Sequence, residues 1–497
     1  MPLSARDLAL RALYGGSASA AGAVAWLCFE ARLPAAGFSA FFLEPSPTAT
    51  GAPRTSASVV AEVRLEGGGG SGVVIVGDDQ TISNGRLTLT ASAATGFMSR
   101  YQDTATGVDV PLAQQWLAYV AAAGQNINGS TQASGAYILR PAAQAPLPLL
   151  PGGAAAALRV VTGPVVSFFE STYAYVTQEA RLWASAGAVE VAWTIGPVNV
   201  SDGDGREVVT RYSVAGLATE GRCHSDANCR EAKPRQRNAR RTNATITEPV
   251  AANFFPSACL VRTASASATL AVALDRSEAS ASLNDGELEL LVHRRLLADD
   301  GRGVGEPLNE PGLDGKGLVI RGTHWVVVAP NSAAPRTYKA LQAQALSLPT
   351  TVRAFAPLGA LSPLQWRAAY RAEASLLAAP LPDNVQLVTL QPLGGSQLLL
   401  RLAHAFELGE DASLSLNTTV SLAALLRGGG GEAAIVSATD MTLPGSRALA
   451  SVEPVTYRTD GGGSITLPQL PQPPSGAGLS VTLVPMAIRT FMCSTAG

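Results

Sequence analysis

Val189-Glu190-Val191-Ala192-Trp193 places large apolar side chains at every second position. A period of two puts those side chains on one face of a β-strand. The same alternation recurs at Arg86-Leu87-Thr88-Leu89-Thr90 and at Glu287-Leu288-Glu289-Leu290, and Gly, Asn or Asp lies close before each segment. Short strands repeated in this way predict an all-β fold built from antiparallel sheets.

Length and composition set the number of domains and argue against some partners. The chain has 497 residues, whereas a single hydrophobic core stops growing at roughly 250–300 residues, so we expect two or three domains. Its 49 Gly and 32 Pro fall between short apolar runs, which favours strands with tight turns over long helices. A net charge of −2 gives no global field to attract nucleic acid or an anionic membrane.

Composition also marks boundaries along the chain. Residues 45–58 are rich in turn-forming residues and poor in apolar anchors, which is typical of a linker. Ser362 to Ala379 is the best helix candidate, and Pro380 would end it. Strands resume from Val385 to Phe491, so the expected helix separates two β regions.

The N-terminal apolar stretch from Ala18 to Phe29 leaves two interpretations open. Arg6 and Arg11 precede it, as charged residues precede the apolar region of a signal peptide. It runs directly into residues 32–38 without a clear small-residue cleavage site, which favours a buried strand. No run approaches the roughly 20 apolar residues that a transmembrane helix needs, so we expect no membrane partner.

The cysteines and histidines match no common metal-binding motif, and we therefore expect no metal site and no metal cofactor in this chain. The four histidines, His224, His293, His324 and His404, are scattered along the chain, and we interpret His293 and His404 as packing or hydrogen-bonded residues. The five cysteines are Cys28, Cys223, Cys229, Cys259 and Cys493. A small loop closed by Cys223 and Cys229 is one open pairing. Candidate N-glycosylation sites, which hint at the secretory pathway, are Asn128, Asn199, Asn243 and Asn417.

Two further patterns have simple interpretations. The Gly-rich runs lack the Lys-Ser/Thr ending of a phosphate-binding loop, and we expect loops at residues 67–70, 428–431 and 461–463. A basic run has no interleaved aromatic residues on which bases would stack, so we expect a surface loop or a site of proteolytic nicking. Its members are Arg230, Lys233, Arg235, Arg237, Arg240 and Arg241.

Several sequence segments resemble segments of the C-terminal half of lysosomal-type α-mannosidases of glycoside hydrolase family 38, and they occur in the same order along the chain. The densest runs from Asp285 to Leu297 and continues through Asp299-Asp300-Gly301-Arg302-Gly303-Val304. The others are Leu33-Pro34-Ala35-Ala36-Gly37-Phe38-Ser39, Ser83-Asn84-Gly85, Ala133-Ser134-Gly135-Ala136-Tyr137-Ile138, Gly205-Arg206-Glu207-Val208, Thr247-Glu248-Pro249-Val250-Ala251, Leu274-Asp275-Arg276-Ser277 and Pro485-Met486-Ala487-Ile488-Arg489-Thr490-Phe491.

The resemblance implies consecutive antiparallel β-sandwich domains, a large galactose-mutarotase-like sandwich and a terminal one. It divides the chain into closing strands of a small β domain (1–45), a linker with the first strand of the next domain (46–79), the large sandwich (80–350), a connecting segment with a short helix (351–384) and the terminal sandwich (385–497). It also implies a lysosomal, vacuolar or extracellular location.

The family removes terminal α-mannose from N-glycans with retention, using two carboxyl groups across the scissile bond. The resemblance implies that those carboxyls, and a zinc bound by histidines and aspartates, belong to an N-terminal half. The sequence has one His-x-Asp triplet, His224-Ser225-Asp226, and it lies outside the segments that carry the resemblance. We therefore assign no catalytic residue here, and the expected partners are mannose-containing glycans and that N-terminal half.

Substrate contact remains the expected contribution of this half. The resemblance implies that Tyr137 reaches the active site, where its phenol would bind a mannose hydroxyl while Gly135 permits close backbone approach. Arg302 is the second expected sugar contact. For Asp299-Asp300-Gly301-Arg302 the residues themselves favour a loop held by an internal Arg–carboxylate ion pair.

Two other functions stay open. One is a non-catalytic carbohydrate-binding or scaffold protein, which glycan binding by the chain alone would reveal. The other is an enzyme with a new site of its own, which is the weakest because no nucleophile, base and orienting residue can be assembled from the motifs.

Overall fold

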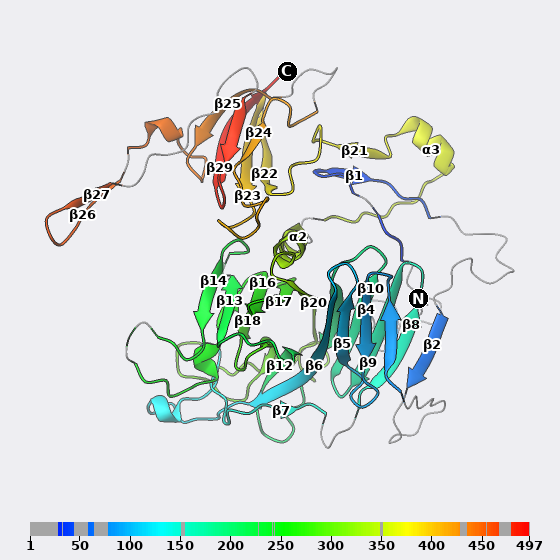
Figure 1. Cartoon of the computed structure of the whole chain (residues 1–497), viewed down its shortest axis with the longest axis vertical. Helices are drawn as coiled ribbons and strands as arrows, with labels where there is room; N and C mark the ends of the chain where they lie inside the picture. Colours follow the sequence, from blue (N-terminus) through cyan, green and yellow to red (C-terminus); the bar gives the residue numbers. More distant parts are fainter. Residues whose placement is uncertain are drawn as a thin grey trace. The chain divides into compact units, whose positions relative to one another are not determined.

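The computed structural model describes residues 28–31, 33–43, 58–63, 78–150, 155–226, 228–240, 242, 244–347, 351–427, 435–453, 455–466 and 479–496. These residues belong to two compact units (Figure 1). The first unit comprises residues 1–30 and 48–351, and the second comprises residues 31–47 and 352–497. Strands account for 44% of the chain and helices for 7%, which confirms the all-β prediction.

Two large antiparallel sheets make up most of the first unit. The ten-stranded sheet has the order β14 (Ala232–Gln236), β13 (Arg222–Asp226), β16 (Leu260–Ala264), β17 (Ala268–Leu274), β20 (Ile320–Pro330), β11 (Val189–Ile195), β10 (Val176–Trp183), β9 (Val166–Tyr173), β8 (Ala157–Thr162), β2 (Ser58–Val63). The nine-stranded sheet has the order β15 (Phe255–Ser257), β18 (Glu278–Ala281), β19 (Glu287–Arg295), β12 (Arg206–Val214), β6 (Val108–Val120), β5 (Met98–Asp103), β4 (Leu87–Ala91), β3 (Gln80–Ser83), with β7 (Leu147–Pro148) also paired to β6.

The core of the first unit lies between these sheets. In β11 every second residue is buried, as the alternation in the sequence predicted. Trp193 of β11 is 2% exposed and meets Trp116 of β6 edge to face, with ring centroids 6.4 Å apart. Burying a large apolar side chain contributes roughly 1.5–3 kcal/mol, so facing rows of such residues hold the two sheets together.

Helix α2 (Ala334–Ser347) covers part of the ten-stranded sheet and was not predicted. Tyr338 and Ala345 of α2 pack with Leu260, Trp325 and Val327, on the face of the sheet away from the main core. The α2 residues that pack on the sheet are spaced three or four apart and so share one helix face; they are Ala334, Tyr338, Leu341 and Ala345. Packing of this face on the sheet stabilises the helix. Short 3-10 helices lie at η1 (Gly129–Thr131) and η3 (Ala251–Asn253).

The helix predicted for Ser362 to Ala379 is much shorter in the structure. Helix α3 (Pro363–Ala369) begins at a capping box in which Ser362 and Gln365 exchange hydrogen bonds. It ends well before Pro380, because the chain turns into strand β21 (Glu373–Ser375), which pairs with β1 (Gly37–Ser39). Pairing with this distant strand satisfies the backbone groups that a longer helix would have satisfied locally.

A second, smaller core lies in the second unit. Its four-stranded sheet has the order β22 (Val385–Gly394), β23 (Gln397–His404), β29 (Ile488–Thr495), β25 (Ile435–Met441), and two-stranded sheets pair β24 (Thr418–Ser421) with β28 (Ser480–Leu483) and β26 (Thr456–Arg458) with β27 (Ser464–Thr466). The 3-10 helix η6 (Leu449–Ser451) follows β25. Leu400 and Phe491 of the larger sheet pack against Val481 and Leu483 of β28.

A test of the first unit's core uses Gly322, which lies opposite Trp193 in the register of β20 and β11. A Cβ atom at Gly322 would lie 2.1 Å from the Trp193 ring. Gly322→Ala should therefore force the indole out of place and lower the free energy of unfolding by about 1–3 kcal/mol, as overpacked core variants do. Urea denaturation measures the loss. Gly129→Ala is the control because a Cβ there meets open space, and equal stability of the two variants would contradict the prediction.

Candidate functional site

The backbone around Tyr137 is fixed by the buried carboxylate of Asp300. The N–H groups of Tyr137 and Ile138 donate to Asp300 Oδ2 at 2.7 and 2.9 Å. The N–H of Arg302 donates to the other oxygen, Oδ1, at 3.1 Å. Asp300 is 1% exposed. One carboxylate thus ties together the two loops that carry both predicted sugar contacts.

Gly135 allows these loops to touch. A Cβ atom at this position would lie 2.5 Å from the backbone nitrogen of Asp300 and 2.6 Å from its Cβ. Real Cβ atoms do not approach backbone so closely, and a larger residue would therefore push the loops apart. The close backbone approach expected at Gly135 is an approach to Asp300.

A second buried carboxylate holds the same loop from the other side. Glu207 of β12 is fully buried and accepts hydrogen bonds from Ser134 Oγ and from Arg294 Nε, both at 2.5 Å. Arg294 also donates to the carbonyl of Ile138 at 2.9 Å. Glu207 lies in the segment Gly205–Val208 that resembles the family, but no local pattern in the sequence indicates this role.

The Tyr137 side chain itself faces away from this support. It is 68% exposed, and its hydroxyl makes no hydrogen bond with any described residue. Arg302 is also exposed, and its guanidinium donates to Gln132 Oε1 at 2.8 Å. A fixed backbone that presents an exposed phenol and an exposed guanidinium is suited to bind a polar ligand.

The expected ion pair within Asp299-Asp300-Gly301-Arg302 is wrong in its details. Asp300 accepts backbone N–H groups, and the guanidinium of Arg302 binds Gln132. Burial alone would raise the pKa of Asp300, but the N–H groups of Tyr137, Ile138 and Arg302 outweigh it and hold that pKa below its usual value. Asp300 therefore stays ionised and structural.

A pocket of about 760 Å³ opens beside Tyr137. Residues 137–139 line it together with residues 251 and 254–256, the start of β18 and the end of β19. The lining includes Phe254 and Leu291 as apolar residues and Glu278 and Arg294 as charged ones. Its volume falls within the roughly 300–1,000 Å³ of small-molecule sites.

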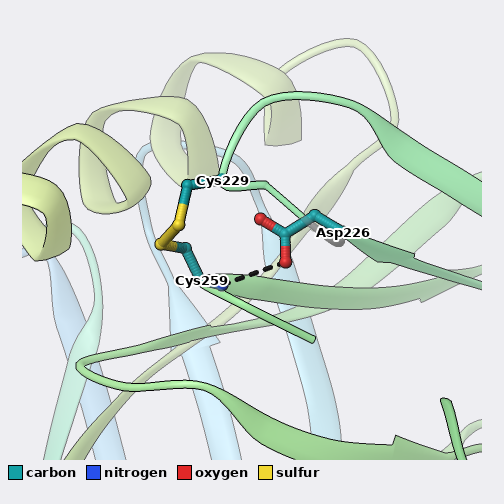
Figure 2. Close-up of side chains that lie close together, drawn as sticks. All are labelled: Asp226, Cys229 and Cys259. Carbon is teal, nitrogen blue, oxygen red and sulfur yellow. Dashed lines mark hydrogen bonds between the residues drawn. A yellow bond between two sulfur atoms is a disulfide. The ribbon is translucent and has the colours of Figure 1, made fainter. Parts of the chain in front are cut away.

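Asp226, Cys229 and Cys259 form a compact group of potential metal ligands, as Figure 2 shows. Cys229 and Cys259 are joined in a disulfide, so their sulfurs are not available as thiolate ligands. Asp226 is fully buried and accepts the backbone N–H of Cys259 at 3.0 Å and the side-chain amide of Gln342 at 2.8 Å. The group therefore has a structural role: Asp226 at the end of β13 binds Gln342 of helix α2, and the disulfide holds the adjacent loop.

This disulfide corrects the pairing considered from the sequence. Cys223 lies on β13 as a free, buried thiol, and Cys229 pairs instead with Cys259. Their loop encloses the basic run, part of which forms strand β14 and is not a loop. Within it, Arg237 forms an ion pair with Asp285 at 2.8 Å. Spacing in the sequence could not reveal which two strand ends meet.

The histidines occupy hydrogen-bonded or packed positions. His324 is fully buried, with Tyr212 Oη 3.1 Å from Nδ1 and both Glu278 oxygens 3.1 Å from Nε2. His404 is fully buried beside Asn384. His293 is partly buried near the carbonyl of Leu318. Three of the four candidate glycosylation sites are exposed, namely Asn128, Asn199 and Asn417, and Asn243 lies outside the described residues.

Comparison with known proteins connects this geometry to a family. Residues 82–302 match the model of the glycosyl hydrolases family 38 C-terminal domain. The chain contains a family 38 C-terminal domain. This match covers the Tyr137 loop and extends to Arg302, and it confirms the resemblance found in the sequence.

Individual relatives agree with the family match. The chain is 34% identical to the lysosomal alpha-mannosidase of Bos taurus over 94% of its own length and 43% of the bovine protein. It is 31% identical to the alpha-mannosidase of Canavalia ensiformis over 94% of its length and 46% of that protein. The chain thus spans less than half the length of these curated relatives, consistent with a C-terminal half.

A solved structure shows the same fold. The alpha-mannosidase from Enterococcus faecalis V583 superposes with a TM-score of 0.50 over 83% of this chain and 42% of that one, at 11% identity. In the part of the chain that the structure describes, no helix has the length and apolar character needed to cross a membrane.

The role of Asp300 in the family 38 domain can be tested by removing its carboxylate. Asp300→Ala would leave three backbone N–H groups without their acceptor, at a cost of roughly 1–3 kcal/mol for each group that stays dry. We expect faster amide exchange at Tyr137, Ile138 and Arg302 and a lower free energy of unfolding. Asp299→Ala is the matched control, because among the described residues its carboxylate accepts a single hydrogen bond, from the N–H of Gly301. Unchanged exchange at Tyr137 in the Asp300 variant would contradict this role.

A second test concerns acid stability. Burial lowers the pKa of His224 from 6.5 to about 4, with the charge of Arg262 as a smaller cause. The folded state therefore favours neutral His224, and its contribution to stability is complete above about pH 6.5 and declines as the pH falls toward 4. His224→Gln cannot be protonated there, so its melting temperature should fall less between pH 7 and pH 5 than that of the unmodified chain. Equal falls would show that His224 does not contribute.

Proposed function

We propose that this chain is the C-terminal β-domain portion of an α-mannosidase that removes terminal α-mannose from N-glycans with retention. In this proposal Tyr137 and Arg302 contact the sugar from the β-domain side. The observation that supports it most is the buried Asp300, which fixes both loops while Tyr137 and Arg302 remain exposed. An exposed tyrosine on so constrained a backbone has a structure suited to binding rather than to packing.

The chain's own residues would position the substrate. The Tyr137 phenol is free to donate to or accept from a sugar hydroxyl. The Arg302 guanidinium, held by Gln132, offers further donors and a fixed positive charge near any group that gains negative charge. In the proposal, hydrolysis depends on carboxyl groups of the N-terminal half, which corresponds to the part of the relatives that this chain does not span.

Zinc does not fit the described residues of this chain. Their only group of three clustered ligands is Asp226, Cys229 and Cys259, in which two sulfurs form a disulfide and Asp226 is engaged by backbone N–H groups. A Lewis-acid zinc, if the complete enzyme uses one, belongs in this proposal to residues of the N-terminal half.

A lysosomal, vacuolar or extracellular location is part of the same proposal. Disulfides persist in oxidising compartments, and the Cys229–Cys259 bond supports passage through one. The exposed Asn199 and Asn417 are accessible for N-glycosylation.

The second candidate is a non-catalytic carbohydrate-binding or scaffold protein. The pocket beside Tyr137 favours it, because a chain with a pocket of this size can bind a small ligand without cleaving it. Glycan binding without activity after reconstitution with a matching catalytic half would support this candidate.

The proposed role of Tyr137 predicts a specific kinetic change. Together with a matching N-terminal half, Tyr137→Phe should lower kcat/KM for an α-mannoside about two- to tenfold, the value of one uncharged hydrogen bond of roughly 0.5–1.5 kcal/mol. The melting temperature should not change, because the Tyr137 hydroxyl binds no described residue. Tyr457→Phe, an exposed tyrosine of the second unit, is the control. An unchanged kcat/KM in the Tyr137 variant would show that the Tyr137 hydroxyl does not contribute to sugar binding.

A further inference from the structure

The amide side chain of Gln132 is buried and binds the loop that carries Arg302. Gln132 is 6% exposed. Its Nε2 donates to the carbonyl oxygen of Asp300 at 2.6 Å and to Asn126 Oδ1 at 2.8 Å. Its Oε1 accepts from Arg302 Nη2 at 2.8 Å. Both donors of this amide and its oxygen are therefore engaged by neighbouring residues.

The orientation of the Gln132 amide follows from partners that can each play only one role. The carbonyl oxygen of Asp300 can only accept a hydrogen bond, so the group that faces it must be the NH2 group. A guanidinium can only donate, so the atom that faces Arg302 must be the oxygen. A reversed amide would place donor against donor and acceptor against acceptor at a buried position, which is costly. The acceptor of Gln132 therefore points to Arg302.

Asn126 extends the same constraint to a second amide. Its Oδ1 accepts from the backbone N–H of Ala133 at 2.9 Å, and its Nδ2 donates to the carbonyl oxygen of Asp299 at 2.8 Å. These backbone groups fix the direction of the Asn126 amide. Its oxygen is then in place to accept from Gln132 Nε2.

Arg140 fixes the backbone that carries Gln132. Its Nη1 donates to the carbonyl oxygen of Gln132 at 2.7 Å, and its Nη2 donates to that of Ser130 at 2.8 Å. Its Nε donates to Glu248 Oε1 at 2.8 Å. Arg302, by contrast, is an exposed side chain with many rotamers of its own, so ordering it requires a partner that is already fixed.

We propose that Gln132 is a positioning residue that orients the Arg302 guanidinium toward the sugar. The inference rests on the proposed function, in which Arg302 contacts the sugar. Gln132 uses one N–H group of the guanidinium and leaves the others to a ligand. Because the amide is neutral, it holds the guanidinium without pairing its charge, as a carboxylate would. Ordering Arg302 before the ligand arrives lowers the entropy lost on binding.

NMR of the guanidinium in the full chain tests the hydrogen bond directly. Hindered rotation keeps the two Nη groups of an arginine distinct, and Arg302→Lys identifies the signals by removing them. Gln132→Leu has a similar size but no polar atom, so it should speed exchange between the Arg302 Nη groups about tenfold. Gln125→Leu is the matched control, because Gln125 is an exposed glutamine of the same loop. Equal exchange rates in the Gln132 variant and the unmodified chain would overturn the proposal.

A kinetic cycle tests whether Gln132 acts through Arg302. Together with a matching N-terminal half, Gln132→Leu should lower kcat/KM for an α-mannoside about tenfold. In an Arg302→Ala background the same change should have little further effect, because the side chain that Gln132 orients is gone. An equal loss in both backgrounds would show that Gln132 only supports the fold, and would overturn the positioning role.

A second variant covers the case in which Gln132→Leu does not fold. Asn126→Gly removes one acceptor that orients Gln132, and the positive φ of Asn126, 57°, suits glycine. It should lower kcat/KM in the same direction and, like the first variant, only where Arg302 is present. Melting curves of all variants, with Gln125→Leu as control, separate this effect from a general loss of stability.

Failure of this inference can be told apart from failure of the proposed function. An unchanged kcat/KM in Arg302→Ala would contradict the proposed sugar contact of Arg302, and the positioning role would be wrong as well. A loss of kcat/KM in Arg302→Ala beside unchanged kinetics in Gln132→Leu would overturn the positioning role alone and leave the proposed function standing.

Discussion

Burial between the two large sheets is the constraint on which the first unit depends. Trp116 and Trp193 come from opposite sheets and meet edge to face, and Gly322 is small because the Trp193 ring lies directly over it. This contact fixes how β6 and β11 face each other. The neighbours of β6 are then placed as well, and among them is β12, which carries Glu207. The position of the Tyr137 loop therefore follows from the packing of the core.

The buried carboxylates of Glu207 and Asp300 hold the Tyr137 loop and the Arg302 loop against this core. Glu207 and Asp300 each accept several hydrogen bonds from one short segment, residues 134–138, or from the chain that faces it. Burying an ionised group is costly unless donors surround it, and here backbone N–H groups and Arg294 provide them. The result is a loop whose backbone has little freedom and whose Tyr137 side chain projects outward. Such preorganisation lowers the entropy lost when a ligand binds.

The sequence predicted those parts of the molecule that repeat a local pattern. Alternation at β4, β11 and β19 identified strands because each has one face on a core. The prediction missed helix α2 and placed the end of α3 too late, because contacts with distant segments determine the structure there. The Cys229–Cys259 bond was missed for the same reason, since two strand ends meet only in the folded chain.

In the candidate site, too, contacts between segments that are distant in the sequence could not be predicted. Tyr137 and Arg302 came from the family resemblance, but their common support, Asp300, was interpreted as the partner of a guanidinium. Retaining hydrolysis needs two carboxyl groups roughly 5–5.5 Å apart across the scissile bond, one of which must exchange a proton. Asp300 has a lowered pKa and three backbone donors, and Glu207 is occupied by Ser134 and Arg294. The carboxylates of Asp300 and Glu207 are therefore occupied by hydrogen bonds that hold the loop. In the proposed function, these residues hold and orient the sugar, and the groups that break the bond belong to the N-terminal half.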